Sequence, residues 1–248
     1  MIKRIIVSTV LLVMASAAAG WAGPKLVVSE DNWEFGDAPN AGTVSHTFKL
    51  TNVGNALLKI LSVSASCGCT STKVENQELK PGESTGITAT FNSAAYPSGG
   101  RYVKQITVLT DDSTAPSKIL TIGATVCATE YTWGGTTPRV IEVRDTSSKG
   151  KGSWQVLEIQ NQTALTQKVT VLEKVGQVAE VKVPGKAIPS GGKGKVRVKV
   201  GAYHNPYPPS SLTLQLGSQE GERRVSIPVT DGANAGASGG FQPPKALN

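Results

Sequence analysis

Residues 48–70 decide the fold of this chain, and they read FKLTNVGNALLKILSVSASCGCT. Apolar and polar residues alternate up to Asn52, a turn follows at residues 52–55, and a second alternating run leads to Cys67-Gly68-Cys69. Alternation with period two, broken by a turn that contains Asn and Gly, is typical of two antiparallel strands. The stretch therefore predicts β structure with two closely spaced thiols at the end of the second strand.

Strand patterns and turn clusters continue on both sides of this stretch. We predict strands at residues 26–29, 42–51, 57–64, 85–91, 103–110 and 118–126, with room for one more short strand after Cys69. Short strands separated by frequent turns are typical of a β-sandwich of about 100 residues. Residues 23–132 are therefore predicted to form one immunoglobulin-like sandwich.

A weaker copy of the same pattern follows in the second half of the chain. Residues 157–161 (LEIQN) repeat residues 48–52 at an offset of 109, and the turn at residues 188–191 repeats that at residues 79–82. Each copy is long enough to bury its own core. We predict an all-β chain of two tandem immunoglobulin-like sandwiches, with the second over residues 139–230 and a linker at residues 133–138.

The two ends of the chain have compositions of their own. Lys3 and Arg4 precede an apolar run at residues 5–19, and small residues follow at Gly20 and Ala22. This pattern predicts a cleavable signal peptide at residues 1–22, with a retained membrane anchor as the alternative. Residues 231–248 are rich in Gly, Ala, Ser and Pro, and we predict a disordered tail.

Charge differs between the two predicted sandwiches. Residues 23–138 carry eight Lys/Arg and ten Asp/Glu, a balance of −2, whereas residues 139–230 carry fourteen and seven, a balance of +7. The two units are therefore expected to present different surfaces. The export signal disfavours nucleic acid as the partner of the basic unit.

Several motifs of the first unit occur in a fixed order. They are FxxTNxG from Phe48, SCGCT from Ser66, LxPGES from Leu79 and a strand that ends at Phe91. In this order they resemble the bacterial domain-of-unknown-function 1573 family over residues 32–126. The resemblance implies an immunoglobulin-like sandwich related to the ASPM/SPD-2/hydin and major sperm protein domains. It also implies an exported bacterial protein, periplasmic or secreted, and it implies no activity.

The three cysteines are the first candidate site. Cα atoms two residues apart on a strand lie about 6.6 Å from each other, at the edge of what a disulfide spans. Cys67 and Cys69 could therefore form a structural bridge, a labile redox pair, or a pair of thiolates for Cu(I). Cys127 either reaches this pair or stays a separate thiol. No other cofactor is expected.

Two further candidate sites lie in the second unit. Lys193, Lys195, Arg197 and Lys199 alternate with apolar residues, so they share one strand face that could meet acidic glycans or a membrane surface. The alternative is a solvated face, or an edge that lysines guard against aggregation. A loop rich in proline and aromatic residues is a candidate recognition loop through Tyr203, His204 and Tyr207.

Catalysis is not expected. Residues 82–86 (GESTG) match the nucleophile-elbow pattern, but that elbow needs a strand before it and a helix after it, whereas here a Pro-Gly turn precedes a strand. We expect a non-enzymatic binding or structural module of the cell envelope, which engages a protein or surface polymer through sheet edges or loops. The alternative function is thiol-redox or copper handling by Cys67 and Cys69. The oligomeric state stays open.

Overall fold

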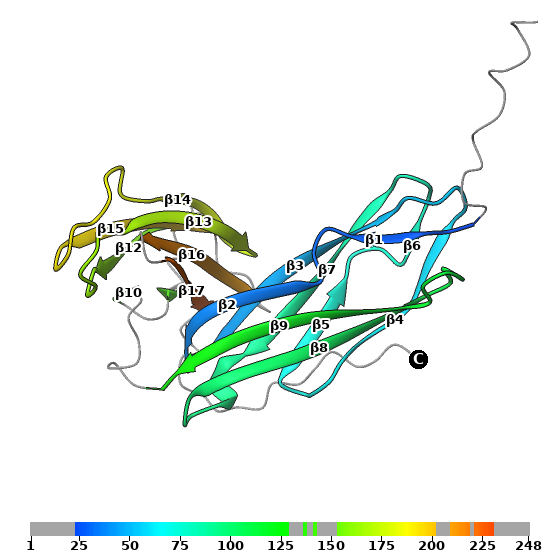
Figure 1. Cartoon of the computed structure of the whole chain (residues 1–248), viewed down its shortest axis with the longest axis horizontal. Helices are drawn as coiled ribbons and strands as arrows, with labels where there is room; N and C mark the ends of the chain where they lie inside the picture. The colour runs from blue at the N-terminus through cyan, green and yellow to red at the C-terminus, as the bar shows by residue number, and fades with distance from the viewer. Residues whose placement is uncertain are drawn as a thin grey trace, which may run out of the picture.

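The computed structural model describes residues 23–128, 136–137, 141–142, 153–201, 209–218 and 221–230 (Figure 1). The predicted signal peptide, most of the predicted linker and the predicted tail lie outside these residues. Over the described ranges the elements are β-strands, with one short 3-10 helix, η1 (Ser93–Ala95). No helix in these ranges is long and apolar enough to span a membrane. The predicted all-β class is confirmed.

The first sandwich packs a four-stranded sheet against the strands of a larger sheet. The four-stranded sheet has the order β1 (Leu26–Val28), β3 (Thr43–Asn52), β7 (Ser84–Asn92) and β5 (Thr70–Val74). The facing strands run in the order β2 (Asn32–Pro39), β9 (Ser117–Cys127), β8 (Gly100–Thr110), β4 (Leu58–Ala65) and β6 (Glu78–Leu79). Between the layers lies one core, whose largest fully buried members include Phe35, Phe48, Phe91, Leu50, Ile87 and Ile106.

The second sandwich repeats this two-layer plan. Its four-stranded sheet has the order β10 (Thr136–Thr137), β12 (Ser153–Gln160), β15 (Lys193–Val200) and β14 (Val178–Lys182). The facing strands are β13 (Lys168–Val175), β16 (Ser210–Ser218) and β17 (Gly221–Thr230), with β11 (Ile141–Glu142) paired to β17. A separate core fills the space between the layers, with Leu157, Val196, Val198, Leu212, Leu214 and Ile227 among its members.

A buried asparagine occupies the same place in both sandwiches. The side-chain amide of Asn52 donates to the carbonyls of Ala56 and Leu79, both at 2.8 Å. The amide of Asn161, 109 positions later, donates at 2.7 and 2.9 Å to the two carbonyls at the same offset, those of Leu165 and Ile188. The internal repeat inferred from the sequence therefore corresponds to a repeated structure, because both asparagines join the end of one strand to the segment just before the strand that pairs with it, β7 for β3 and β15 for β12.

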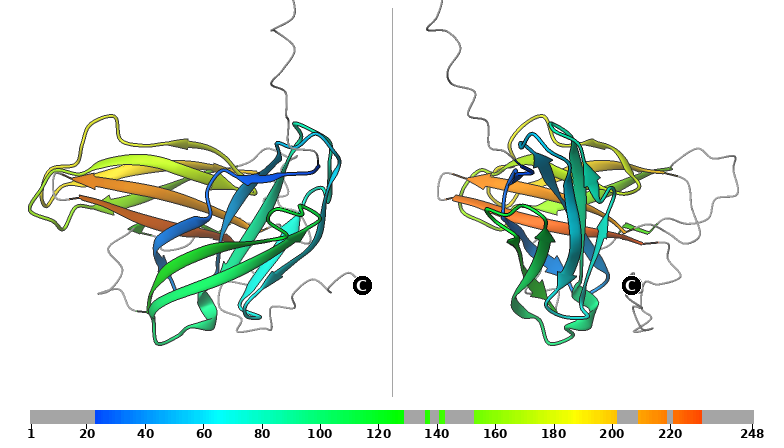
Figure 2. Two further views of the ribbon diagram at one scale, coloured as in Figure 1. Left: turned by 45° about the vertical axis from the view of Figure 1, so that its right-hand side comes forward. Right: turned by 90° about the vertical axis from the view of Figure 1, so that its right-hand side faces the viewer.

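The two sandwiches share one continuous sheet. Strand β17 of the second sandwich pairs in parallel with β2 of the first through Val225 and Asp37, which gives a nine-stranded sheet that crosses both units. The two bodies meet at a bend rather than in a straight line (Figure 2). At this junction Gly36 lies so close to Arg224 that a Cβ at Gly36 would overlap the Arg224 backbone carbonyl. The junction is therefore a packed interface.

Strand β2 is the main element that the strand pattern missed. Its pairing with β9 shifts register between Glu34 and Gly36, and the burial of its residues loses strict alternation there. A bulge of this kind breaks the period-two signal that reveals a strand in sequence. The strand expected after Cys69 is present as β5.

Candidate functional site

The Cys67-Gly68-Cys69 segment forms the corner at which the chain passes from one sheet of the first sandwich to the other. Strand β4 ends at Ala65, and β5 begins at Thr70 in the facing sheet. The Thr70 N–H donates to the Cys67 carbonyl at 3.2 Å, which closes a tight turn. Cys67 and Cys69 are disulfide-bonded, with 5.4 Å between their Cα atoms. This turn brings the Cα atoms closer than the spacing of about 6.6 Å expected for an extended strand.

The disulfide is half-exposed and lies beside an aromatic cluster. The Cys69 carbonyl accepts the Asn92 N–H at 2.9 Å, at the end of β7. The neighbouring Phe91 ring stacks on Tyr96, with 5.5 Å between centroids, and Tyr96 lies 3.8 Å from Tyr102. The Lys104 ammonium lies 5.4 Å from the Tyr96 ring centroid. The corner is thus held by backbone hydrogen bonds, and the aromatic cluster begins one residue before Asn92.

Cys127, the third cysteine, has a different setting. It is the last residue of β9 and is buried. It packs in the core of the second sandwich, together with Ile141, Val225 and Ile227. Its position indicates a packing role at the junction of the two units, apart from the Cys67–Cys69 disulfide. Over the described ranges, no group of three or more His, Cys, Asp or Glu side chains is arranged to hold a metal ion.

The corner joins two edge strands that are open on the same rim of the sandwich. Strand β4 pairs with β8 on one side and with the two-residue strand β6 on the other, and β5 pairs only with β7 among the described strands. The Ser66 N–H donates to the Gln105 carbonyl at 2.9 Å, and hydrogen-bonded pairs alternate along an antiparallel ladder. The N–H and C=O groups of Val63 and Ala65 therefore point away from β8, toward the open side.

The outer face next to the β4 edge carries large apolar side chains. These residues are exposed at 62% for Leu61 on β4, 55% for Val103 and 40% for Leu109 on β8, and 50% for Ile119 on β9. Around them lie uncharged residues, such as Ser62, Ser64, Thr107 and Thr121. The rim thus combines unpaired backbone groups with apolar side chains and few charges.

The basic residues of the second sandwich lie on the outer face of β15, as the alternation predicts. Lys193, Lys195 and Arg197 are exposed and Lys199 is half-exposed, whereas Val196 and Val198 are buried. Two further residues on neighbouring strands join them, Trp154 on β12 and Lys182 on β14. The Lys182 ammonium lies 5.0 Å and the Arg197 guanidinium 4.9 Å from the Trp154 ring. Trp154 was not identified from the sequence, although the alternation of Trp154, Val156 and Glu158 on β12 could have revealed it.

The predicted recognition loop, with Tyr203, His204 and Tyr207, lies outside the described residues. The elbow-like motif is accounted for by its structure. Ser84 begins β7, and its hydroxyl group lies 2.8 Å from the hydroxyl group of Thr51 rather than beside a histidine. This position, in a turn that leads from β6 of one sheet into β7 of the other, supports the interpretation of residues 82–86 as a turn followed by a strand.

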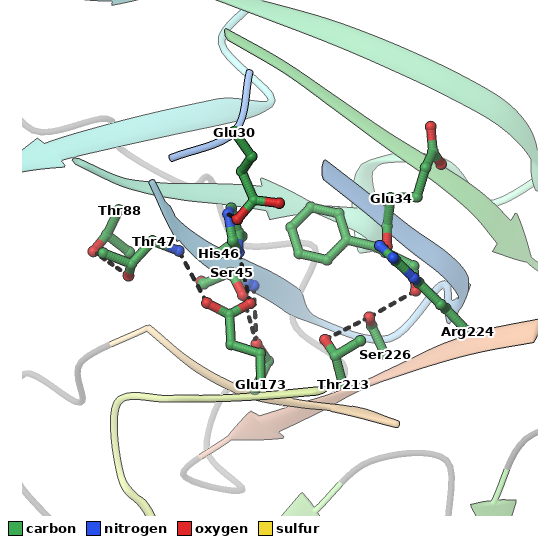
Figure 3. A network of polar contacts seen from close by, with 12 residues as sticks. Glu30, Glu34, Ser45, His46, Thr47, Thr88, Glu173, Thr213, Arg224 and Ser226 are labelled. Atoms are coloured by element: carbon green, nitrogen blue, oxygen red, sulfur yellow. Dashed lines mark hydrogen bonds and ion pairs between the residues drawn. The ribbon is translucent and has the colours of Figure 1, made fainter. Parts of the chain in front are cut away.

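The junction between the sandwiches contains a buried polar network (Figure 3). His46 stacks on Trp33 at 3.9 Å, and its Nδ1 atom lies 2.8 Å from Glu173 Oε2 on β13. The other oxygen of Glu173 accepts the Thr47 N–H at 3.1 Å. Nearby, the Ser226 hydroxyl donates to the Phe35 carbonyl at 2.8 Å. The network therefore fixes the second sandwich on the first, a role that the sequence did not reveal because its partners are more than 120 residues apart.

Comparison with known proteins agrees with the resemblance seen in the sequence. Residues 26–126 match the model of a family described as "Protein of unknown function (DUF1573)". The first sandwich belongs to this family. The match ends at residue 126, so it does not include the second sandwich. No curated protein matches the chain significantly.

Solved structures with a similar fold share little sequence with the chain. A protein of unknown function from Porphyromonas gingivalis W83 is 13% identical, with a TM-score of 0.34 over 84% of this chain and 99% of that one. The Vibrio cholerae VesB protease is 18% identical, with a TM-score of 0.33 over 41% and 31% of the two chains. The Pseudomonas aeruginosa CupB2 chaperone is 8% identical, with a TM-score of 0.32 over 82% and 100%. Likenesses at this level establish no common role.

Proposed function

We propose that this chain is a non-enzymatic binding module of the cell envelope, and that it pairs an extended segment of a partner protein with the open edge of β4. One observation carries the proposal. Along residues 61–65, no described strand pairs with the side of β4 opposite β8. Exposed rows of N–H and C=O groups can accept another chain as an additional strand.

Over residues 62–65 the β4 edge lacks the features that protect the edges formed by β1, β5 and β14. Strand β5 carries Lys73, β1 has three residues, and β14 combines a register shift with Glu180 and Lys182. Charges, short length and bulges are the usual protection of edge strands. Beyond its own register shift near Leu61, β4 continues with neither charge nor proline to Ala65. An edge with fewer of these protections than β1, β5 and β14 supports a binding role.

The side chains beside this edge indicate the chemistry of the partner segment. A strand added next to β4 would extend the outer face that carries Leu61 and Leu109. Every second side chain of the added strand would therefore point toward an apolar, uncharged surface. We expect a segment with β-branched or aromatic residues at alternate positions.

Two observations support the placement in the envelope. The first is the signal-like N-terminal sequence, with its basic residues and apolar run. The second is the half-exposed Cys67–Cys69 disulfide, since disulfides persist in oxidising compartments outside the cytoplasm. The disulfide braces the corner between the two edge strands, so it would also hold the β4 rim in its open shape.

The experiment replaces Ala65 by proline, which removes the backbone N–H that points away from β8 and toward the open side of β4. Peptides are selected from a displayed library of short random segments on the full chain, and their affinity is measured by fluorescence anisotropy. Ala65→Pro is expected to weaken binding at least about tenfold, because each lost backbone bond and the altered edge geometry disfavour strand addition. Ala65→Ser keeps the N–H and is the matched control. Ala179→Pro places a proline on the unrelated edge strand β14.

Hydrogen exchange then identifies the edge that is used. Bound peptide is expected to slow exchange of the Val63 and Ala65 amides, since both would donate to the added strand. Peptides that protect β14 instead, or that bind Ala65→Pro as tightly as Ala65→Ser, would contradict the proposal. Circular dichroism of each variant establishes that the fold is retained.

A thiol role for Cys67 and Cys69 is the second candidate, and the half-exposed position of their disulfide favours it. Mass spectrometry after alkylation, with and without mild reductant, counts the thiols that open and close reversibly. For copper, anaerobic titration of the reduced protein with Cu(I) should saturate, and the double variant Cys67→Ser, Cys69→Ser should not bind. A disulfide that resists reductant in the folded protein would exclude both chemistries.

A further inference from the structure

The outer face of β15 is a straight row of positive charge, one strand wide. Lys193, Lys195, Arg197 and Lys199 point from the same face, and the Cα atoms of residues two apart on a strand lie about 6.6 Å from each other. Strand β15 is the third of four strands, between β12 and β14, so both of its edges are already paired. The row therefore presents side chains and offers no backbone groups to a ligand.

Part of this row is held in place by an aromatic ring. Trp154 lies on β12, and the cationic groups of Lys182 and Arg197 lie at 5.0 and 4.9 Å from its ring. A cation over an aromatic face gains about 0.5–1 kcal/mol at an exposed site, enough to restrict a long side chain. Two of the cations are thus pre-positioned on the face, which lowers the entropy that a ligand must overcome.

Acidic residues occur on both neighbouring strands, and each already has a cation of its own. Glu158 on β12 pairs with Lys193 at 2.6 Å, and Glu180 on β14 pairs with Lys182 at 3.3 Å. No described carboxylate forms an ion pair with Lys195, Arg197 or Lys199. On this face, the positive charge that has no ion-pair partner therefore lies along β15, between the carboxylates of Glu158 and Glu180.

We propose that this face binds a linear acidic polysaccharide along β15. A narrow row of cations between carboxylates suits a single chain with regularly spaced anionic groups. A flat anionic bilayer would also press its headgroups against Glu158 and Glu180, which repel them. A peptide strand would need free backbone groups, and β15 has none to offer. This surface lies on the second sandwich and is separate from the β4 edge, so the two proposals are independent.

The experiment measures binding of polygalacturonate to the full chain by isothermal titration calorimetry, with uncharged dextran as the neutral polymer. Binding is expected with polygalacturonate alone and should weaken as salt is raised, since exposed charges are screened. Lys195→Glu with Lys199→Glu is expected to weaken binding at least about tenfold, because both reversals place like charges opposite the ligand. Lys73→Glu with Lys80→Glu changes the net charge equally on exposed residues of the first sandwich.

Two further measurements test whether the ligand of β15 is a polysaccharide. Glu158→Gln with Glu180→Gln should tighten polymer binding, because it removes the flanking repulsion. Vesicles that contain phosphatidylglycerol are expected to bind weakly, and tight vesicle binding that depends on Lys195 and Lys199 would overturn the proposal in favour of a lipid surface. Equal losses in the β15 variant and in the first-sandwich variant would also overturn it, because binding would then follow net charge alone.

Discussion

The two sandwiches differ most on their surfaces and least in one buried polar side chain. Asn52 and Asn161 are both fully buried, and each holds two backbone carbonyls through its amide group. In contrast, among the residues that the structure describes, the Cys67–Cys69 corner and the open β4 edge belong to the first sandwich and the cationic row on β15 to the second. Buried polar bonds are expensive to lose, so the fold retains them while edges and faces are free to change. The functions proposed here accordingly lie on the surfaces that differ.

The largest effect is expected when the buried asparagine of each sandwich is replaced, one at a time. Asn52→Ala and Asn161→Ala each leave two backbone carbonyls without their donor at a buried site. We expect each variant to lower the free energy of unfolding of its own sandwich by about 3 kcal/mol. Denaturant unfolding measures the loss in each unit, with the fluorescence of variants that keep Trp33 alone for the first sandwich and Trp154 alone for the second.

The control for this pair is Asn55→Ala, which alters an asparagine of the same turn that has a 2.8 Å bond to the exposed Gly23 N–H. Its effect should stay within about 0.5 kcal/mol. An Asn161→Ala variant that lowers both transitions equally would mean that the two sandwiches unfold as a single unit. It would contradict the expectation that each asparagine stabilises its own sandwich.

The next largest effect is expected at the junction, where a substitution tests how strongly the two sandwiches depend on each other for stability. Glu173→Ala removes the acceptor of the Thr47 N–H and the partner of His46 Nδ1, at 3.1 and 2.8 Å. We expect a loss of about 2 kcal/mol, because both groups lie in a largely buried network. The two unfolding transitions should also move apart, since the contact that couples them is weakened. Scanning calorimetry measures the separation.

Glu180→Ala is the matched control, because Glu180 lies on the exposed face of β14 with one exposed partner, Lys182. An exposed ion pair contributes about 0–1 kcal/mol. If Glu173→Ala were no more disruptive than Glu180→Ala, the polar network would not be what joins the sandwiches.

Much of this architecture follows from period-two alternation alone. The alternation predicted β3, β4, β7, β8 and β9 to within a few residues, as well as the outward direction of Lys195 and Arg197. Alternation reports which side of a strand is buried, so it works wherever a strand has one face in a core. It failed at β2, where the shift near Gly36 interrupts the pattern.

The contacts between the units could not be predicted in the same way. His46 meets Glu173 and Asp37 meets Arg223 across more than 120 residues of sequence, and no local pattern reports such pairs. The sequence also left open whether Cys67 and Cys69 form a bridge, because a turn and an extended strand both accommodate Cys-Gly-Cys. Trp154 was overlooked for a different reason, since an aromatic residue in an alternating run is most often a core residue.

Acid should distinguish the two sandwiches by a smaller amount. Burial by itself would raise the pKa of Asp112, but hydrogen bonds from Leu26, Thr114 and Ala115 outweigh it and hold this pKa below its ordinary value of 3.8. The ionised carboxylate therefore stabilises the fold above the unfolded-state pKa, and that contribution is lost as pH falls through the lower, folded-state pKa. Asp112 lies in the turn between β8 and β9 and bonds to the N–H of Leu26, so this contribution belongs to the first sandwich.

We expect the first sandwich to lose about 1 kcal/mol relative to the second as the pH is lowered from about 6 to about 3. Denaturant unfolding at a series of pH values measures this difference. Asp112→Asn should be less stable at neutral pH and should show a smaller loss in acid, because no charge is left to neutralise. An unchanged pH dependence in Asp112→Asn would assign the acid response to other carboxylates.

The smallest effect is expected at Gly68, in the Cys-Gly-Cys motif of the first sandwich. Gly68 is exposed, its φ lies outside the left-handed region, and a Cβ there would meet no atom within 4 Å. Gly68→Ala should therefore change the free energy of unfolding by no more than about 0.5 kcal/mol and leave the disulfide formed. Unfolding and a count of alkylated thiols measure both quantities.

Gly36→Ala is the contrasting variant, because Gly36 has a φ of +69° and lies against the Arg224 backbone, so even one methyl group should destabilise the junction by at least about 1–2 kcal/mol. Loss of the Cys67–Cys69 disulfide in Gly68→Ala would mean that the corner needs a backbone conformation only glycine adopts, and the bracing of the β4 rim would then depend on Gly68 as much as on the two cysteines.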